Sequence, residues 1–388
     1  MRIATFLACV LAGSGCATVT SKGPTTLTDP PMQVTQSDQE NAALAFISYT
    51  GSGLDHPDEV VDSVLYRCVA NELDTQPLTK GKYELVWGPA VFKFSDAQFD
   101  DNMMYVVQRQ GSRDFVVAIR GTNFSSLSDW IAEDFNVGST VPWDVPDGQR
   151  STAPPDPRIS KATDVGLRVL QTLAPEFSGK ASTTVREFLS GENANSDGIG
   201  RVTVVGHSLA GALAPAFALW LSDTRSRWDA NSSTQIMVTA LAGATGGNRD
   251  YATYYDSQLG DNTRRIHNPE DVVPLAWNME DLETLPGLYV PNGINATGTE
   301  RFLIEQAIDI SRDADYAQIV PNAPSLEAGV IDSATTYIEQ AAWQHHCGYY
   351  CGLGIADIKG VTTPMRPLQS CAGSTDSRIC NRCPHETP

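Results

Sequence analysis

The chain has 388 residues, of which 41% are hydrophobic and 8% aromatic, which suffices for one large α/β domain with insertions or for two smaller domains. Its formal net charge of −19 argues against nucleic acid as a partner and disfavours tight adsorption to anionic lipid, because no basic stripe offsets the acidic residues. An acidic balance of this size also suits an exported protein that must remain soluble.

Residues 1–16 are predicted to be a signal peptide with a lipobox-like end. Arg2 supplies the positive charge, and the apolar run 3–12 is too short to span a bilayer. Cys16 stands where a bacterial lipobox has its acylated cysteine, although Gly13 replaces the usual aliphatic residue. We therefore expect lipidation at Cys16 and an outer-membrane lipoprotein; cleavage by an ordinary signal peptidase, giving a periplasmic or secreted protein, is the alternative.

Three further regions follow the signal peptide. Residues 17–39 are expected to form a polar tether, 40–355 the main α/β domain, and 356–388 a Cys-rich C-terminal tail. Six cysteines remain after Cys16, an even number that favours disulfides in an oxidising compartment: Cys68, Cys347, Cys351, Cys371, Cys380 and Cys383. A zinc cluster of tail cysteines with His385 is the less favoured interpretation, and the pairing of the cysteines stays open.

The predicted elements alternate between strand and helix through the middle of the chain. In chain order they are a helix at 38–49, short strands at 83–87 and 91–94, a hairpin of strands 103–109 and 114–119, a long loop at 137–157, helices at 159–173 and 183–189, a strand at 202–205, a helix at 209–221, a strand at 235–241, a helix at 250–259, a strand at 263–267, and helices at 301–310 and 329–344. Alternation from 114 to 274 predicts a mostly parallel central sheet with helices on both faces.

The most informative stretch is the turn Gly206-His-Ser-Leu-Ala210 between a β-branched strand and an Ala- and Leu-rich helix. A serine at such a turn is a nucleophile elbow, in which a strained backbone exposes the hydroxyl at the top of the sheet. Gly206 and Ala210 are small because strand and helix pass close together there. The N-terminus of the following helix directs N–H groups at any oxyanion formed beside Ser208.

A Gly-Thr pair directly follows the strand at 114–119. The second oxyanion donor of an α/β-hydrolase comes from this edge of the sheet, so the backbone N–H of Thr122 is a candidate.

A serine nucleophile needs an imidazole base and a carboxylate that orients the base, in the chain order Ser, Asp or Glu, His. Position in the chain leaves His345 and His346 as candidates for the base. The candidates for the acid that follow the strand at 235–241 are Asp250, Asp256, Asp261, Glu270 and Asp271. Asp271 follows a strand and a turn, which is where a triad acid belongs.

Five blocks of the sequence resemble, in order, those of the class 3 (fungal-type) lipases. They are Ala118-Ile-Arg-Gly-Thr122, Asp129-Trp130-Ile131, Val205-Gly-His-Ser-Leu-Ala-Gly-Ala-Leu-Ala214, Thr239-Ala-Leu-Ala-Gly-Ala-Thr-Gly-Gly-Asn248 and Asn268-Pro-Glu-Asp-Val-Val-Pro274. The resemblance covers about residues 103–350. The elbow departs from the family at Ala210, where the family usually has Gly.

The resemblance implies that Ser208 is the nucleophile, Asp271 the acid, and Thr122 and Leu209 the oxyanion-hole donors. The family's histidine is commonly followed three residues later by an aromatic residue, which favours His346, with Tyr349, over His345 as the base. By the same resemblance, residues 124–135 hold the place of a lid helix.

The sequence thus predicts an exported serine hydrolase acting on lipid carboxylic esters, with no metal or organic cofactor. The alternatives are a phospholipase A-type enzyme, a peptide or thioester hydrolase, a secreted effector acting on foreign membranes, and a non-catalytic envelope lipoprotein of the same fold. The expected partner is a lipid or ester substrate, with possible membrane attachment through Cys16, and the oligomeric state is left open.

Overall fold

A computed structural model describes most of the central part of the chain. The described residues are 31–50, 58–92, 102–121, 137–143, 156–175, 182–194, 198–332 and 334–355. The signal peptide with Cys16, the position of Thr122, the expected lid at 124–135 and the Cys-rich tail all lie outside these ranges.

A six-stranded sheet forms the centre of the domain, in the order β1-β2-β3-β6-β7-β8. Its strands are β1 (Tyr83–Phe92), β2 (Asn102–Arg109), β3 (Asp114–Ile119), β6 (Arg201–His207), β7 (Gln235–Leu241) and β8 (Thr263–Ile266). The pairs β1–β2 and β2–β3 are antiparallel, whereas β3–β6, β6–β7 and β7–β8 are parallel. The predicted hairpin and the parallel sheet are both confirmed, and the two short strands expected around Gly88 form the single strand β1.

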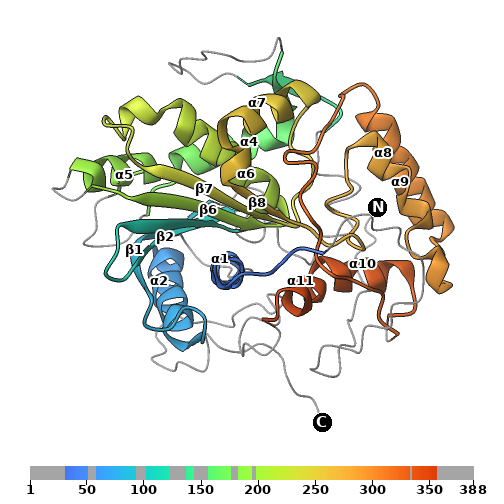
Figure 1. The fold of residues 1–388 in the computed structure, drawn as a ribbon, viewed down its shortest axis with the longest axis horizontal. Helices are drawn as coiled ribbons and strands as arrows, with labels where there is room; N and C mark the ends of the chain where they lie inside the picture. Colours follow the sequence, from blue (N-terminus) through green and yellow to red (C-terminus); the bar gives the residue numbers. More distant parts are fainter. Residues whose placement is uncertain are drawn as a thin grey trace.

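Helices cover both faces of this sheet (Figure 1). One face carries α1 (Gln36–Ile47) and α2 (Asp58–Thr75), and the other carries α4 (Lys161–Thr172), α5 (Val185–Ala194), α6 (Leu209–Asp223) and α7 (Arg249–Leu259). A short ribbon of β4 (Thr140–Pro142) and β5 (Arg158–Ser160) precedes α4. The predicted helix at 159–173 therefore starts two residues too early, because Ile159 belongs to β5 and Ser160 caps α4.

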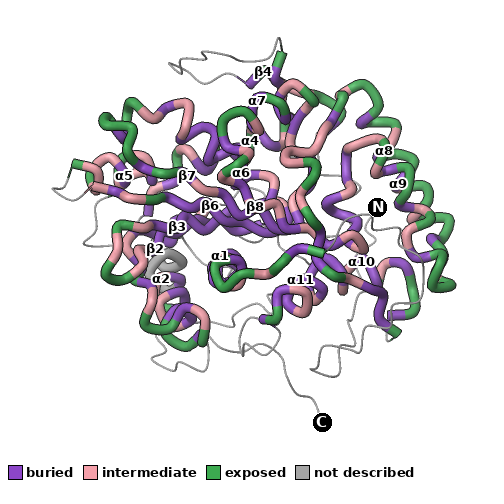
Figure 2. The backbone as a smooth tube through the Cα atoms, viewed as in Figure 1, coloured by how far each residue is buried: buried purple, intermediate pink, exposed green. Residues whose placement is uncertain are grey.

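The strands are buried on both faces because helices lie above and below them. Along β3, Phe115 and Val117 face the core under α4 and α6, whereas Val116 and Ala118 face the core under α1. An uninterrupted apolar run is the pattern expected of such a strand. Figure 2 shows the resulting continuous buried band through the middle of the molecule.

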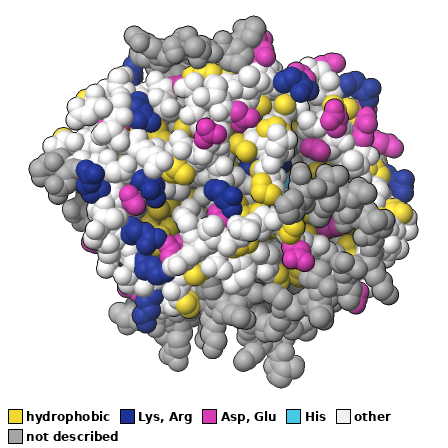
Figure 3. Space-filling model, viewed as in Figure 1, with side chains coloured by type: hydrophobic (Ala, Val, Ile, Leu, Met, Phe, Trp, Pro, Cys, Tyr) yellow, Lys and Arg dark blue, Asp and Glu magenta, His cyan; other side chains and the backbone are white. Residues whose placement is uncertain are grey.

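A third apolar core lies beyond the carboxyl end of the sheet. It is built by α8 (Met279–Leu282), α9 (Gly298–Ser311) and α10 (Tyr337–His345), followed by α11 (Cys347–Gly352). The predicted helix at 329–344 starts eight residues too early, because Thr336 and Glu339 form a capping box that begins α10 at Tyr337. On the face seen in Figure 3, acidic and basic side chains are interspersed with apolar ones.

Helix α1 is fastened across the sheet by buried charges. Thr35 caps it, and the Asp38 carboxylate accepts two hydrogen bonds from Arg264 of β8, at 2.9 and 3.0 Å. Glu40 accepts hydrogen bonds from Lys82 and Tyr83 at the start of β1. The folded domain therefore includes residues 36–39, which were predicted to be part of the tether.

Every helix among the described residues is too short or too polar to span a bilayer.

Candidate active site

Three loops converge at the carboxyl end of the parallel strands. In the sheet register Ile119 is level with Gly206, His207 with Leu241, and Leu241 with Ile266. The chain segments that leave β3, β6 and β8 therefore emerge at the same edge of the sheet. Ligands of open α/β sheets bind at this edge.

Ser208 occupies a sharp turn between β6 and α6, with φ 64° and ψ −126°. Such a backbone conformation is rare for a residue with a side chain and marks stored strain at a functional position. The turn is held because the Ser208 N–H donates to the carbonyl of Leu241, at 3.0 Å. The predicted nucleophile elbow is thus present in the backbone.

The elbow requires a glycine at position 206. A Cβ atom there would lie 2.3 Å from the carbonyl oxygen of Ala210 and 2.7 Å from its Cβ. Strand and helix can approach this closely only because one partner lacks a side chain. The same geometry shows why Ala210 is accepted where the family usually has Gly.

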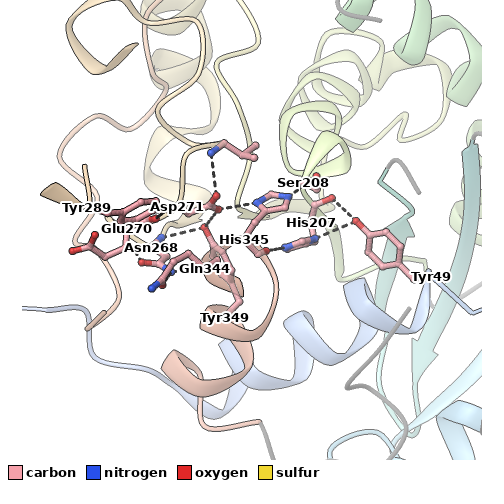
Figure 4. A network of polar contacts seen from close by, with 11 residues as sticks. Tyr49, His207, Ser208, Asn268, Glu270, Asp271, Tyr289, Gln344, His345 and Tyr349 are labelled. Carbon is pink, nitrogen blue, oxygen red and sulfur yellow. Dashed lines mark hydrogen bonds and ion pairs between the residues drawn. The ribbon is translucent and has the colours of Figure 1, made fainter. Parts of the chain in front are cut away.

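His345 joins Ser208 to Asp271 (Figure 4). Its Nδ1 lies 2.9 Å from Asp271 Oδ2, and its Nε2 lies 2.8 Å from Ser208 Oγ. A carboxylate only accepts, so Nδ1 carries the hydrogen and Nε2 is left to accept from the serine hydroxyl. The side chains of His345 and Asp271 are fully buried.

His346, the histidine preferred from the sequence, lies elsewhere. Helix α10 buries Tyr337, Ala341 and His345 at helical spacing, so the last of these continues the inward face. His346 follows the helix with φ −120° and ψ −76°, and its ring packs edge-on against Tyr350. The expectation that His346 contacts Ser208 is therefore wrong, because the end of α10 turns its ring away toward α1.

Burial and the nearby His345 lower the pKa of His346 to about 3. Its ring consequently stays uncharged at neutral pH.

Asp271 is held by three donors. Its Oδ2 accepts from His345 and from the Tyr349 hydroxyl, both at 2.9 Å, and its Oδ1 accepts from the Val273 N–H at 3.0 Å. The carboxylate can therefore move little relative to the imidazole. The other acidic candidates lie elsewhere: the Asp256 carboxylate accepts from Val320 N–H, and that of Asp250 from Asp156 N–H.

Glu270, the neighbour of Asp271, has a different environment. Burial raises the pKa of its carboxyl above the usual value. Its backbone carbonyl accepts a hydrogen bond from Tyr289, at 2.7 Å. Asp261 lies in a short 3₁₀ turn after α7, Gly260–Asn262.

Two amide side chains support the residues around the acid (Figure 4). Asn268 donates its backbone N–H to the Tyr349 hydroxyl, at 3.1 Å, and its side-chain amide to Gln344 Oε1, at 2.8 Å. Gln344 in turn donates to the carbonyl of Gly329, at 2.8 Å. These residues were not predicted from the sequence, although Gln344 and His345 share the buried face of α10.

The surroundings of Ser208 include two of the segments expected to bind an oxyanion. Leu209 is the first residue of α6, where backbone N–H groups have no acceptor within the helix. Gly121, the residue before Thr122, lies so close that a Cβ on it would be 3.3 Å from Ser208 Cβ. Among the described residues, no group of three His, Cys, Asp or Glu side chains could hold a metal ion.

The fold and the connected serine, histidine and aspartate define an α/β-hydrolase with the arrangement of a serine hydrolase. The profile of the family "Lipase (class 3)" matches residues 116–280. The solved structure of M37 lipase is 33% identical, and the match covers 82% of this chain and 92% of that lipase, with a TM-score of 0.74. The chain therefore belongs to the class 3 lipase family and is a carboxylic ester hydrolase.

Two other solved lipases are more distant. Lip2 lipase from Yarrowia lipolytica is 19% identical over 63% of this chain and 76% of its own length, with a TM-score of 0.44. Lipase II from Rhizopus niveus is 18% identical over 62% of this chain and 73% of its own, with a TM-score of 0.41. A search of curated proteins finds no match.

Proposed function

We propose that the protein is an exported lipase that hydrolyses triacylglycerol-type lipid esters through an acyl-enzyme on Ser208. The observation that carries this proposal is the continuous contact from Ser208 Oγ to His345 Nε2 and from His345 Nδ1 to Asp271 Oδ2. Three buried side chains in this order match the roles that acyl transfer requires: nucleophile, base and orienting carboxylate.

In the proposed reaction Ser208 Oγ attacks the ester carbonyl while His345 Nε2 takes the serine proton. Asp271 holds the imidazole in the tautomer that leaves Nε2 free to accept, and it stabilises the imidazolium that forms. The imidazolium then gives its proton to the departing alcohol. Water, activated by His345 in the same way, attacks the acyl-enzyme and releases the carboxylic acid.

The oxyanion of each tetrahedral intermediate is proposed to bind the backbone N–H groups of Leu209 and Thr122. The position of Leu209 at the start of α6, and that of Gly121 against Ser208, support this assignment. One such donor contributes about 3–4 kcal/mol of transition-state stabilisation in comparable sites.

An apolar pocket beside the acid supports a lipid as the substrate. It adjoins the turn that follows Asp271 and extends between α8, α9 and α10. Its lining includes Val272, Val273, Trp277, Leu285, Ile304 and Tyr337. A concave surface with this apolar lining suits an acyl chain better than a polar substrate.

Export and lipid attachment at Cys16 are part of the proposal. Cys68 and Cys351 are disulfide-bonded, and disulfides are typical of oxidising compartments, which supports export. Mass spectrometry of the N-terminal peptide from purified membranes tests the anchor: we expect an acylated Cys16, and an unmodified terminus downstream of Cys16 would refute it.

A substrate panel tests the function. Purified full-length protein is given triacylglycerols and p-nitrophenyl esters of short and long acyl chains, together with phosphatidylcholine vesicles, with Ser208→Ala as the control. We expect turnover of the neutral esters that is lost in Ser208→Ala. Preferential release of fatty acid from the vesicles would instead favour a phospholipase. A folded wild-type protein without activity on any of these substrates would favour the non-catalytic envelope lipoprotein.

A further inference from the structure

We propose that Tyr49 and His207 are positioning residues that hold the base and the end of β3 at fixed places around Ser208. The inference rests on the proposed function, because it concerns the geometry of the same reaction. Tyr49 follows α1, more than sixty residues before the part of the chain that matches the family profile.

His207 precedes the nucleophile, and its side chain is fully buried. Its Nε2 lies 2.9 Å from the backbone carbonyl of His345. A carbonyl can only accept a hydrogen bond, so Nε2 must carry a hydrogen. His207 thereby holds the backbone of His345, the base that takes the proton of Ser208.

Burial, together with the neighbouring His345 and His346, keeps the pKa of His207 well below its usual value. The ring is therefore neutral, and with its hydrogen on Nε2 it has a lone pair on Nδ1 that needs a donor. The Tyr49 hydroxyl is that donor: it lies 3.1 Å from His207 Nδ1 and 3.1 Å from the carbonyl oxygen of the same residue. Both acceptors belong to His207, so either direction of the hydroxyl hydrogen fixes this residue.

The same hydroxyl reaches the end of β3. It lies close to Gly121, two residues past the end of this strand. A Cβ at Gly121 would lie 2.4 Å from the Tyr49 hydroxyl and 2.5 Å from the His207 carbonyl, so only glycine permits this approach. One phenol thus connects three segments: the residue before the proposed oxyanion donor Thr122, the residue before the nucleophile, and, through the His207 ring, the base.

The position of Tyr49 is itself fixed. Arg120 donates from Nε to the carbonyl of Ser48 and from Nη2 to that of Thr50, both at 2.7 Å. The residues on either side of Tyr49 are therefore attached to the end of β3. A displacement of about 1 Å at reacting groups can cost on the order of 100-fold in rate, so an anchor of this kind affects kcat rather than substrate binding.

Tyr49→Phe, which removes only the hydroxyl, tests the inference. Tyr105→Phe is the matched control, because the Tyr105 hydroxyl is also buried and donates to α1, at the carbonyl of Leu44 over 2.6 Å. We expect Tyr49→Phe to lower kcat by about 10- to 100-fold with KM within twofold of the wild type. We expect Tyr105→Phe to keep the wild-type kcat at a similar loss of thermal stability. Equal kcat values in the two variants, or a change in KM alone, would overturn the inference.

Two variants of His207 separate positioning from packing. In His207→Gln the amide N–H can still donate to the His345 carbonyl, whereas in His207→Leu no donor remains. We expect the Gln variant to keep at least tenfold more kcat than the Leu variant. Equal loss in both would contradict a role for this hydrogen bond.

Nitrogen NMR of the histidine rings in the wild-type protein is independent of turnover and of the folding of any variant. We expect His207 to be neutral, with hydrogen on Nε2 and an accepting Nδ1, from pH 5 to 9. A protonated ring or the opposite tautomer would overturn the inference while leaving the ester hydrolase intact. If the wild type does not hydrolyse esters, or if Ser208→Ala keeps the wild-type activity, the proposed function fails first, and the positioning role fails with it.

Discussion

The His345 imidazole donates a hydrogen bond to the carboxylate of Asp271 over 2.9 Å, and the two residues are 74 positions apart in the chain. The segment between them builds α8, α9 and α10 and the apolar core that these helices share. The segment between the two residues therefore packs over the carboxyl end of the sheet. The packing of α10 and the contact with Asp271 together fix the orientation of the base.

Tyr349 should matter because its hydroxyl gives Asp271 a second donor on Oδ2. Hydrogen bonds to charged groups contribute about 1.5–3 kcal/mol. We therefore expect Tyr349→Phe to lower kcat by roughly tenfold. Tyr350→Phe is the control, because the Tyr350 hydroxyl contacts His346 and not the acid, at 3.3 Å. Steady-state kinetics with a soluble ester gives both values, and equal activities of the two variants would contradict the role of Tyr349.

Adding a methyl group at Gly206 should be far more damaging than removing one at Ala210. Gly206→Ala places a Cβ 2.3 Å from the Ala210 carbonyl oxygen, so β6 and α6 must separate. We expect a loss of several kcal/mol in the free energy of unfolding and a loss of activity. Ala210→Gly creates no clash and should cost about 1 kcal/mol or less at unchanged kcat. Urea unfolding and ester hydrolysis check both variants; a stable, active Gly206→Ala protein would refute the close approach.

Glu72 of α2 should lower the stability of the protein as the pH rises from acidic to neutral. Burial raises the pKa of its carboxyl to about 7 in the folded protein, above the value of the unfolded chain. A raised folded pKa means that the protonated form favours folding, and this contribution is lost as the pH rises from about 4.5 to 7. We expect the free energy of unfolding of Glu72→Gln, relative to that of the wild type, to increase by on the order of 2–3 kcal/mol from pH 5 to pH 8.

Urea unfolding at the two pH values measures this difference. Asp74→Asn, an exposed carboxyl on the same helix, is the control and should show no such gain. A pH-independent difference between Glu72→Gln and the wild type would contradict the burial of a protonated carboxyl.

His346 should contribute to acid sensitivity rather than to catalysis. Its pKa is about 3 in the folded protein, below that of an unfolded histidine. As the pH falls below about 6.5, the unfolded chain takes up a proton that the folded chain does not, so stability declines until about pH 3. The wild type should lose about 2–3 kcal/mol of its free energy of unfolding through this residue from pH 7.5 to pH 4.5, and we expect His346→Phe to abolish that loss. An unchanged pH dependence of unfolding would contradict this.

The sequence predicted the parts of the fold that depend on local pattern. Strand β7 was predicted with its observed bounds, and the elbow followed from a β-branched strand, a small-residue turn and an Ala-rich helix. Helix α2 was missed, as was α11, whose Gly- and Tyr-containing sequence is a weak helix former and is stabilised by packing against α1.

Which of the two adjacent histidines points into the site depends on which face of α10 each occupies. The presence of an aromatic residue three positions later, which favoured His346, carries no information about that face. Tyr337, Ala341 and His345 lie four residues apart on one face of α10, and this spacing is the signal that could have identified His345. Tyr349 follows His345 by four residues rather than three. The contacts of Tyr49 arise from a helix distant in sequence, and no local pattern could predict them.

The most direct test of the triad compares His345→Ala with His346→Ala in labelling by a fluorophosphonate probe and in hydrolysis of a p-nitrophenyl ester. We expect kcat of His345→Ala to fall by about 10⁴-fold or more, as for bases of other triads. We also expect this variant to lose the rapid labelling of Ser208. We expect His346→Ala to keep labelling and activity within about tenfold of the wild type, since the His346 ring packs against Tyr350 and it is His345 that joins Ser208 to Asp271. The reverse result, with His346→Ala inactive and His345→Ala active and folded, would contradict the assignment of the base.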